Sequence, residues 1–354
     1  MSRFFHPRYA NLKPYVPGEQ PREKKFIKLN TNESPYPPSK RAVAAAKAEA
    51  ERLELYSDPT AKGLCEAFAQ VVGVSPDEVM ATNGSDEILN FAFMAYCGAD
   101  RLAVFPDITY GFYPVFANLH GIPYTEIPLR GDFTVDVEAI CQTPGTVFLA
   151  NPNAPTGIAL PVSEIEKILQ SHPNDVVVID EAYVDFGGES SVKLIPKYEN
   201  LLVTQTFSKS RSMAGARLGF GIGQAALIAD LQTIRNSTNP YNVNRMTMAA
   251  GIGALADEDY TRANCKEIMR TRTQTANALA ELGFAVLPSE TNFLFAKHPK
   301  IGGYELYRAL YDRGILVRHF NTPKLKDYNR ITVGSPEQME ALLRNIKEIL
   351  EEIK

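Results

Sequence analysis

Short apolar runs alternate with amphipathic, helix-forming stretches through the middle of the chain. The clearest apolar runs cover residues 79–82, 102–105, 146–150 and 175–180. The last run is apolar between Asp175 and Asp180 and ends in the Asp180 carboxylate, as expected for a strand buried on both faces in the centre of a sheet. Strands that alternate with helices in this way predict a mostly parallel sheet with helices on both faces, over residues 79–223.

The two ends of the chain have different patterns. Residues 1–39 are rich in Pro, Tyr and charge and predict an irregular arm, which must lie on the globular body or on a partner subunit. A helix-forming run at 39–54 then opens a large domain, residues 40–244. Residues 245–354 predict a smaller α+β domain with a long helical stretch at 245–282, strands that include 315–318, and a final amphipathic helix.

Composition narrows the class of protein. A chain of 354 residues with 45% hydrophobic content is long enough for about two domains. Its 37 basic and 41 acidic residues leave a formal charge of -4, without the basic excess of a nucleic-acid binder. The four cysteines are scattered, the five histidines lack metal-ligand spacing, and there is no signal-peptide core or membrane-length apolar run. We therefore expect a cytoplasmic protein with no metal and no membrane or nucleic-acid partner.

The stretch 206–221 carries the strongest chemical signal. It places Lys209 and Arg217 among glycines directly after an apolar run. Glycines allow a ligand to approach the backbone closely, and the carboxyl end of a strand is where open α/β sheets bind ligands. A lysine amine there can form a Schiff base with a carbonyl compound while its neighbours hold an anion. This combination favours a pyridoxal phosphate site over a solvated loop.

The phrase formed by Ser208, Lys209 and residues 214–220 closely resembles the cofactor-lysine segment of class I and II aminotransferases, a family of fold type I pyridoxal phosphate enzymes. Two arm phrases, 12–19 and 28–35, resemble the histidinol-phosphate branch of that family. The resemblance extends over nearly the whole chain. It implies a large α/β domain that binds pyridoxal 5'-phosphate, a smaller C-terminal domain, an N-terminal arm, and a homodimer with shared active sites.

The resemblance also implies roles for residues around the cofactor ring. Lys209 would hold the cofactor covalently and then act as general base. Asp180 would pair with the protonated ring nitrogen, since an unpaired carboxylate at the end of a buried strand is costly. Tyr183 would bond the phenolic oxygen, and Tyr110 would stack on the ring. From the residues alone, Asp180 could instead cap a helix, and Tyr110 could belong to the core.

The expected phosphate contacts come from several segments. The turn of Gly84, Ser85 and Asp86 precedes a predicted helix, whose free N–H groups can bind a phosphate. Ser85 or Asp86 could equally cap that helix, and the two interpretations are compatible. The resemblance adds Ser208 and Arg217 to this set. It also implies that Tyr56 reaches the phosphate of the partner subunit, whereas the residues alone allow a half-buried tyrosine before a turn.

One position departs from the family pattern. Family members commonly have Asn before Pro-Thr-Gly, with its amide bonded to the phenolic oxygen of the cofactor, and this chain has Ala154. Asn151, Asn153 or a water molecule could replace that contact, and the sequence leaves the three alternatives open.

The expected substrate residues are Tyr15, Arg318 and Arg330. The planar fork of arginine makes paired bonds to phosphate oxygens, although arginines at strand ends can also be surface residues. The resemblance implies transamination of histidinol phosphate with 2-oxoglutarate, which yields imidazole acetol phosphate and glutamate. An aromatic amino-acid aminotransferase and a threonine-phosphate decarboxylase are alternatives within the same class. A catalytically silent binding protein is the alternative from another class, and the presence of Lys209 and Asp180 argues against it.

Overall fold

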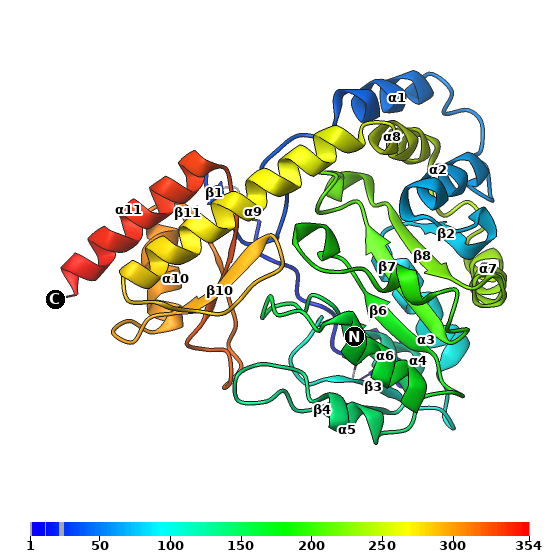
Figure 1. The fold of residues 1–354 in the computed structure, drawn as a ribbon, viewed down its shortest axis with the longest axis horizontal. Coiled ribbons are helices and arrows are strands. Elements are labelled where there is room, and N and C mark those ends of the chain that lie inside the picture. The colour runs from blue at the N-terminus through cyan, green and yellow to red at the C-terminus, as the bar shows by residue number, and fades with distance from the viewer. Residues whose placement is uncertain (1, 11, 21–24, 354) are drawn as a thin grey trace.

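A seven-stranded sheet forms the centre of the computed structural model, which describes residues 2–10, 12–20 and 25–353 (Figure 1). The strands in spatial order are β2 (Val79–Thr82), β8 (Gly219–Gly223), β7 (Leu201–Thr206), β6 (Val177–Asp180), β5 (Thr146–Ala150), β3 (Ala103–Pro106) and β4 (Tyr124–Ile127). Strand β8 is antiparallel to its neighbours β2 and β7. The pairs from β7 to β4 are parallel. The predicted α/β class with a mostly parallel sheet is confirmed.

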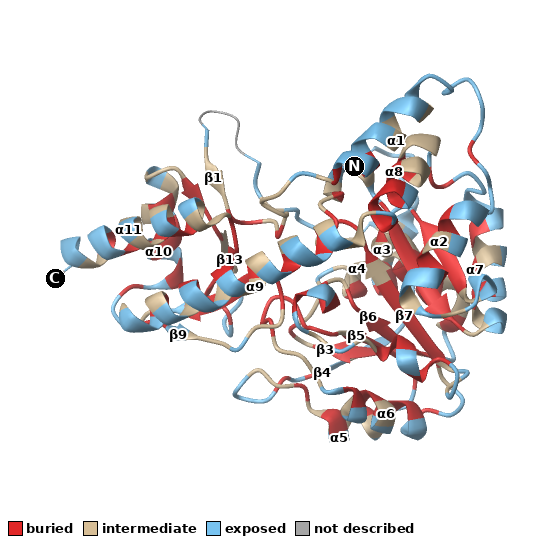
Figure 2. Ribbon diagram, turned by 45° about the horizontal axis from the view of Figure 1, so that its top comes forward, coloured by how far each residue is buried: buried red, intermediate tan, exposed pale blue. Residues whose placement is uncertain are grey.

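Helices cover both faces of this sheet because alternate strand residues are apolar on each side. Val177 and Ile179 belong to one apolar cluster and Val178 to another. The first cluster includes residues of α2 (Lys62–Val72), α5 (Val137–Cys141), α6 (Val162–Ser171) and α8 (Arg245–Leu255). The second includes residues of α3 (Ser85–Tyr96), α4 (Tyr113–His120) and α7 (Ala225–Thr238). Figure 2 shows buried strands between helices whose outer sides are exposed.

The C-terminal part is built on a second sheet, which is antiparallel. Its order is β12 (Arg318–His319), β13 (Asn329–Thr332), β10 (Phe293–Lys297) and β9 (Ala285–Val286). Helices α9 (Glu258–Glu281), α10 (Gly303–Asp312) and α11 (Pro336–Glu352) complete it. The long α9 runs from the end of α8 to this part of the molecule (Figure 1).

Two predicted elements are divided in the structure. The helical stretch 245–282 is two helices, α8 and α9, because α8 packs on α1 (Lys40–Ala50) and acidic residues after Asp257 start a new helix. The predicted strand 315–318 is also divided. Its first half is β11 (Ile315–Leu316), which pairs with the arm, and its second half is β12 in the antiparallel sheet.

The N-terminal arm lies against the C-terminal part. Strand β1 (Ile27–Lys28) pairs in parallel with β11, and the backbone of Leu29 then bonds to both Leu316 and Thr332. Residues 1, 11 and 21–24 of the predicted arm lie outside the described residues. The division of the chain at residues 39 and 244 stays a prediction.

Short 3-10 helices join several of these elements. They are η1 (Pro7–Tyr9), η2 (Pro76–Glu78), η3 (Val184–Phe186), η4 (Ser191–Leu194) and η5 (Ala214–Ala216). Helix α1 begins after the Ser39 cap and ends at Ala50, four residues before the predicted end at 54. Within the described ranges, none of the helices has both the length and the apolar character needed to span a bilayer.

Candidate active site

Two adjoining cavities lie at the carboxyl ends of β5, β6 and β7. The inner cavity has a volume of about 110 Å3 and the outer about 830 Å3. Tyr110, Ala154, Tyr183 and Lys209 line both. The inner cavity is also lined by Ser85, Asp86, Ala150, Pro152, Asp180, Ala182, Thr206, Ser208 and Arg217. Eight of the predicted site residues therefore surround one small space.

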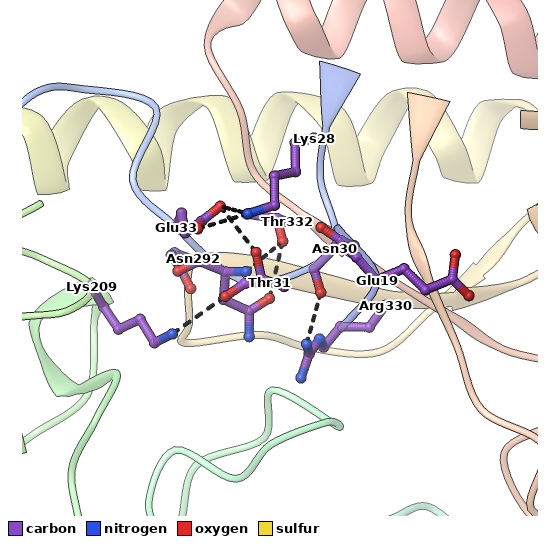
Figure 3. Close-up of polar contacts among 10 residues, drawn as sticks. Glu19, Lys28, Asn30, Thr31, Glu33, Lys209, Asn292, Arg330 and Thr332 are labelled. Carbon is purple, nitrogen blue, oxygen red and sulfur yellow. Dashed lines mark hydrogen bonds and ion pairs between the residues drawn. The ribbon is translucent and has the colours of Figure 1, made fainter. Parts of the chain in front are cut away.

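Lys209 stands at the boundary of the two cavities. It follows the end of β7, and its side chain points toward the arm (Figure 3). Its Nζ donates to the backbone carbonyl of Thr31 at 3.4 Å and lies 5.8 Å from the centre of the Tyr183 ring. The single bond to a carbonyl at this distance is weak. The amine is thus held in the cavity without a strong partner, as a nucleophile requires.

Asp180 is a buried carboxylate at the end of β6. Its oxygens accept bonds from the Thr204 hydroxyl at 3.2 Å, the Ala182 N–H at 3.2 Å and the Tyr113 hydroxyl at 3.4 Å. The Ala182 bond fits the capping interpretation as well. Burial, and secondly the Asp86 carboxylate, raise the pKa of Asp180 to about 6. No ion pair to Asp180 occurs in the described part of the chain. A protonated ring nitrogen in the cavity would supply the missing cation.

The opposite end of the inner cavity is suited to an anion. Helix α3 begins there, with Gly84 in a left-handed conformation at φ 78°. Gly219 packs directly on this turn, because a Cβ at that position would lie 2.3 Å from the backbone N of Ser85. Arg217, on the η5–β8 turn, donates to the Asp86 carboxylate at 3.0 Å and to the Ser208 hydroxyl at 3.4 Å. Free N–H groups and a guanidinium together form a site for a phosphate.

Tyr110 and Asp86, which both line the inner cavity, are joined by a hydrogen bond. The Tyr110 hydroxyl donates to Asp86 at 2.6 Å. The Tyr110 ring also lies 6.4 Å from that of Tyr15, on the arm. An aromatic ring that lines both cavities is placed where it could cover a planar cofactor.

Tyr56 is the predicted site residue that lies away from these cavities. Its side chain is 79% exposed and stacks on Tyr241 with ring centres 4.6 Å apart. Arg245 bonds the Tyr56 carbonyl at 2.9 Å and fixes the backbone. Leu53 and Leu55 beside it are also exposed. The structure does not bring Tyr56 to the cavity of its own chain.

The outer cavity contains the three predicted substrate residues. Tyr15 stacks on Phe112 with ring centres 4.3 Å apart. Arg318 donates to the carbonyls of Pro17 at 3.5 Å and Val16 at 3.4 Å. These long bonds to the arm leave the guanidinium available to an anion.

Arg330 lies deeper in the same cavity. It donates to the Asn30 carbonyl at 3.1 Å, beside the Thr31 carbonyl that Lys209 contacts (Figure 3). Its guanidinium packs over the Phe293 ring at 5.3 Å, and burial lowers its pKa. The buried Nε has no hydrogen-bond partner among the described residues. Arg330 is therefore a half-buried cation with a buried Nε, which an anionic ligand would stabilise.

The amides of Asn151 and Asn153 do not face the cavity. Asn151 bonds the backbone of Leu160 through both its Nδ2, at 3.1 Å, and its Oδ1, at 2.7 Å. Asn153 donates to the Ile108 carbonyl and the Thr156 hydroxyl, each at 3.0 Å. Asn151 thus closes the 151–160 loop, and Asn153 links this loop to Ile108. Neither replaces the amide that Ala154 lacks.

Sequence reasoning missed three polar residues of the site. Thr204 and Tyr113 bond Asp180, and Asn32 of the arm bonds the Tyr183 hydroxyl at 2.9 Å. Asn32 lies in the arm phrase 28–35, whose resemblance did not indicate this position. Thr204 could have been found from its place in the apolar run that ends beside Lys209, because neighbouring parallel strands end at one sheet edge.

The raised pKa of Asp180 predicts a dependence of stability on pH. Because the native pKa, about 6, exceeds the ordinary value of 3.8, the folded protein loses stability as pH rises through this window. The loss should be on the order of 3 kcal/mol for a shift of about two units. In protein without added ligand, Asp180→Asn should therefore raise the free energy of unfolding more at pH 7.5 than at pH 4.5. Urea unfolding of the wild type and the variant at the two pH values measures this difference. Burial also raises the pKa of Glu181 to about 7, but Glu181 is present in both proteins, so its contribution cancels in the comparison. An equal change in the free energy of unfolding at both pH values would contradict this prediction.

Comparisons with known proteins agree with this geometry. The family model for aminotransferase class I and II matches residues 24–346. The histidinol-phosphate aminotransferase 2 of Dechloromonas aromatica (strain RCB) is 48% identical over 354 residues, 99% of both chains. That of Rhizobium meliloti (strain 1021) is 48% identical over 351 residues, 99% of this chain and 100% of the relative.

Solved structures of similar fold include an aminotransferase and a decarboxylase. The crystal structure of histidinol-phosphate aminotransferase from Sinorhizobium meliloti in complex with pyridoxal-5'-phosphate superposes with a TM-score of 0.88 at 25% identity, covering 100% of this chain and 99% of that one. L-threonine-O-3-phosphate decarboxylase from Porphyromonas gingivalis shares the fold, with a TM-score of 0.80 at 22% identity over 92% of this chain and 100% of that one. Within the described residues, no group of three or more His, Cys, Asp or Glu side chains is placed to hold a metal ion. The chain belongs to the aminotransferase class I and II family.

Proposed function

We propose that this aminotransferase uses pyridoxal 5'-phosphate to transfer the amino group of histidinol phosphate to 2-oxoglutarate, in histidine biosynthesis. The products are imidazole acetol phosphate and glutamate. The observation that carries the proposal is the arrangement of one lysine, one buried carboxylate and one anion site around the inner cavity, beside an outer cavity with two arginines. The histidinol-phosphate aminotransferases that match this chain over its full length support the choice of substrate.

The residues of the inner cavity fit the proposed cofactor. When bound, pyridoxal phosphate supplies an aldehyde that reacts with amines and a ring that accepts electrons. Asp180 would hold the proton on the ring nitrogen, and Tyr183 would donate to the phenolic oxygen. Ser85, Asp86, Ser208 and Arg217 surround the position for the phosphate, with Gly84 shaping the turn. Tyr110 would cover one face of the ring.

Lys209 would perform the proton transfer. Its amine lies where the two cavities meet, so it can reach a substrate carbon that enters from the outer cavity. It would remove the proton from the carbon that bears the substrate amine and return it on the cofactor side. Its Nζ contacts the Thr31 carbonyl at this boundary at 3.4 Å.

The outer cavity would select the substrate. Histidinol phosphate carries an amine and a phosphate and has no carboxylate, so the site needs strong donors for a dianion remote from the amine. Arg318 and Arg330 supply such donors, and Tyr15 adds a hydroxyl. In the return half-reaction Arg330 would bind the carboxylate of glutamate. The same cation would thus serve both substrates in alternation.

Initial-rate measurements test this choice. We expect the protein, purified with pyridoxal phosphate, to use histidinol phosphate with a much higher kcat/KM than phenylalanine or tyrosine. A wide preference for an aromatic amino acid would indicate the alternative aminotransferase. Release of carbon dioxide from threonine phosphate would indicate the decarboxylase. A protein that neither binds the cofactor nor turns over any of these substrates would indicate the alternative of a catalytically silent binding protein.

We also propose that the protein is a cytoplasmic homodimer with shared active sites. Tyr56 supports this, because it is exposed on its own chain beside the exposed Leu53, Leu55 and Tyr241. A tyrosine in this position can reach a phosphate only in another subunit. None of the four cysteines, all in the described part of the chain, forms a disulfide, as is usual in a reducing compartment.

Mixed dimers test the proposed role of Tyr56. Tyr56→Phe and Lys209→Ala should each be crippled alone, because the first removes a phosphate contact and the second the amine. A dimer with one subunit of each type has one site with both residues intact. Half of the dimers in an equimolar mixture are mixed, so we expect about a quarter of the wild-type activity after subunit exchange. No recovery in verified mixed dimers would contradict a shared site.

A further inference from the structure

Asn32 links the arm to the active site through one hydrogen bond. Its side chain is 1% exposed, and its Nδ2 donates to the Tyr183 hydroxyl at 2.9 Å. The residue adopts a left-handed backbone conformation, φ 57°, which Asn accepts more readily than most residues. Both Asn32 and Tyr183 line the outer cavity together with Lys209. A buried amide of the arm thus contacts a hydroxyl that faces the reaction site.

The surrounding bonds fix the orientation of this amide. The Thr332 hydroxyl accepts the backbone N–H of Asn32 at 3.0 Å and donates to its Oδ1 at 3.0 Å. Asn292 donates to the backbone carbonyl of Asn32 at 2.9 Å and so holds the backbone of this segment, whereas Thr332 orients the side-chain amide. Figure 3 shows Asn292 and Thr332 beside the arm residues Asn30 and Thr31. With Oδ1 held by Thr332, the NH2 group lies on the side of Tyr183.

This orientation determines which way the Tyr183 proton points. A phenol hydroxyl keeps its proton near the ring plane, in one of two positions, and the other side presents a lone pair. Because Asn32 donates to Tyr183, the lone pair faces Asn32 and the proton points away from it. We propose that Asn32 is a positioning residue, which acts through Tyr183 by directing the hydroxyl proton into the cavity toward the phenolic oxygen of the cofactor. This inference rests on the proposed function.

The neighbouring side chains explain why the direction of this proton matters here. Ala154 lines both cavities beside Tyr183 and has no polar group. The Nδ2 of Asn151 donates to the Leu160 carbonyl, and the Nδ2 of Asn153 donates to the Ile108 carbonyl and the Thr156 hydroxyl. The Tyr183 hydroxyl is therefore the group that can donate a hydrogen bond on this side of the cavity. A rotated proton would place a lone pair against a negatively charged oxygen.

The pH dependence of the cofactor spectrum tests the inference. A donated bond lowers the charge density on the phenolic oxygen, so its loss favours the protonated form of the bound cofactor and moves the absorbance transition to higher pH. We expect Asn32→Gly, which keeps the left-handed conformation, to raise the midpoint in the same direction as Tyr183→Phe, by roughly half to one pH unit. The loaded variant should also lose pyridoxal phosphate on dialysis roughly two- to tenfold faster.

Three further variants make the test specific. Asn32→Gly in the Tyr183→Phe background should add no further shift, because Asn32 acts through the hydroxyl. Asn292→Ala, which loosens the same arm segment without touching the amide, should leave the midpoint unchanged. Ala154→Asn, which places a new amide beside Tyr183, should reverse much of the shift of Asn32→Gly. If Asn32→Gly does not fold, the isosteric Asn32→Asp takes its place, and its shift should be larger with Tyr183 than with Phe at that position.

The outcomes separate this inference from the proposed function. An unchanged midpoint in Asn32→Gly, or a full shift that persists in the Tyr183→Phe background, would overturn the role of Asn32 while the wild type still binds its cofactor. A wild-type protein that binds no pyridoxal phosphate would overturn the proposed function, and the inference with it.

Discussion

The variant Lys209→Ala should lose the long-wavelength absorbance of bound pyridoxal phosphate and nearly all turnover. Only a primary amine can form a Schiff base with the cofactor aldehyde, and the described lining of the inner cavity contains a single lysine. The same amine would move the proton in the chemical step, and a lost general base alone lowers rates roughly a hundred- to ten-thousandfold. Absorbance spectra and single-turnover rates with histidinol phosphate measure both effects.

A matched control separates this result from the loss of any lysine. Lys197 is exposed and pairs with Glu166 on the surface, so Lys197→Ala should keep both the absorbance and the rate. The cofactor phosphate contacts remain in Lys209→Ala, and the variant should still bind pyridoxal phosphate without a covalent bond. Full transamination by Lys209→Ala would refute the proposed role of this residue.

Several residues that line the inner cavity could be predicted from the sequence because they lie at or just after the ends of strands. Asp180 ends β6 and Lys209 follows β7, and these strands are parallel neighbours. The carboxyl ends of parallel strands meet at one edge, so residues 29 positions apart in the chain are placed together by the strand pattern alone. The bond from Thr204 to Asp180 depends in addition on register, since these two residues are paired across the strands. A run of apolar residues does not specify register on a sheet buried on both faces.

The arm could not be placed from its sequence. It has no hydrophobic period, and its contacts join residues about 300 positions apart, such as Asn32 with Thr332 and Asn30 with Arg330. The polar phrase around Asn32 indicated function without indicating a partner. The split of the predicted strand at 315–318 has the same origin, because β11 is formed by pairing with arm strand β1. These contacts place Asn32 beside Tyr183, which no local pattern could predict.

The variant Arg330→Ala should weaken both half-reactions. Arg330 is half-buried in the outer cavity, and its Nε has no hydrogen-bond partner among the described residues. It would bind the phosphate of histidinol phosphate in one half-reaction and the carboxylate of glutamate in the other. A charge-assisted bond contributes about 1.5–3 kcal/mol, so we expect roughly a ten- to hundredfold loss of kcat/KM for each substrate. Stopped-flow measurement of each half-reaction separately gives the two values.

Comparison with neighbouring variants assigns the loss to the substrate anion. Arg318→Ala and Tyr15→Phe should reduce kcat/KM for histidinol phosphate more than for glutamate, because the larger, doubly charged phosphate needs more donors than a carboxylate. Arg330→Lys should recover only part of the loss, since an ammonium keeps the charge without the paired fork. Arg270→Ala, an exposed arginine on α9 that pairs with Glu267, is the control and should change neither value. If Arg330→Ala turns over histidinol phosphate at the wild-type rate, the phosphate is bound elsewhere, and the assignment of substrate fails while membership of the aminotransferase family stands.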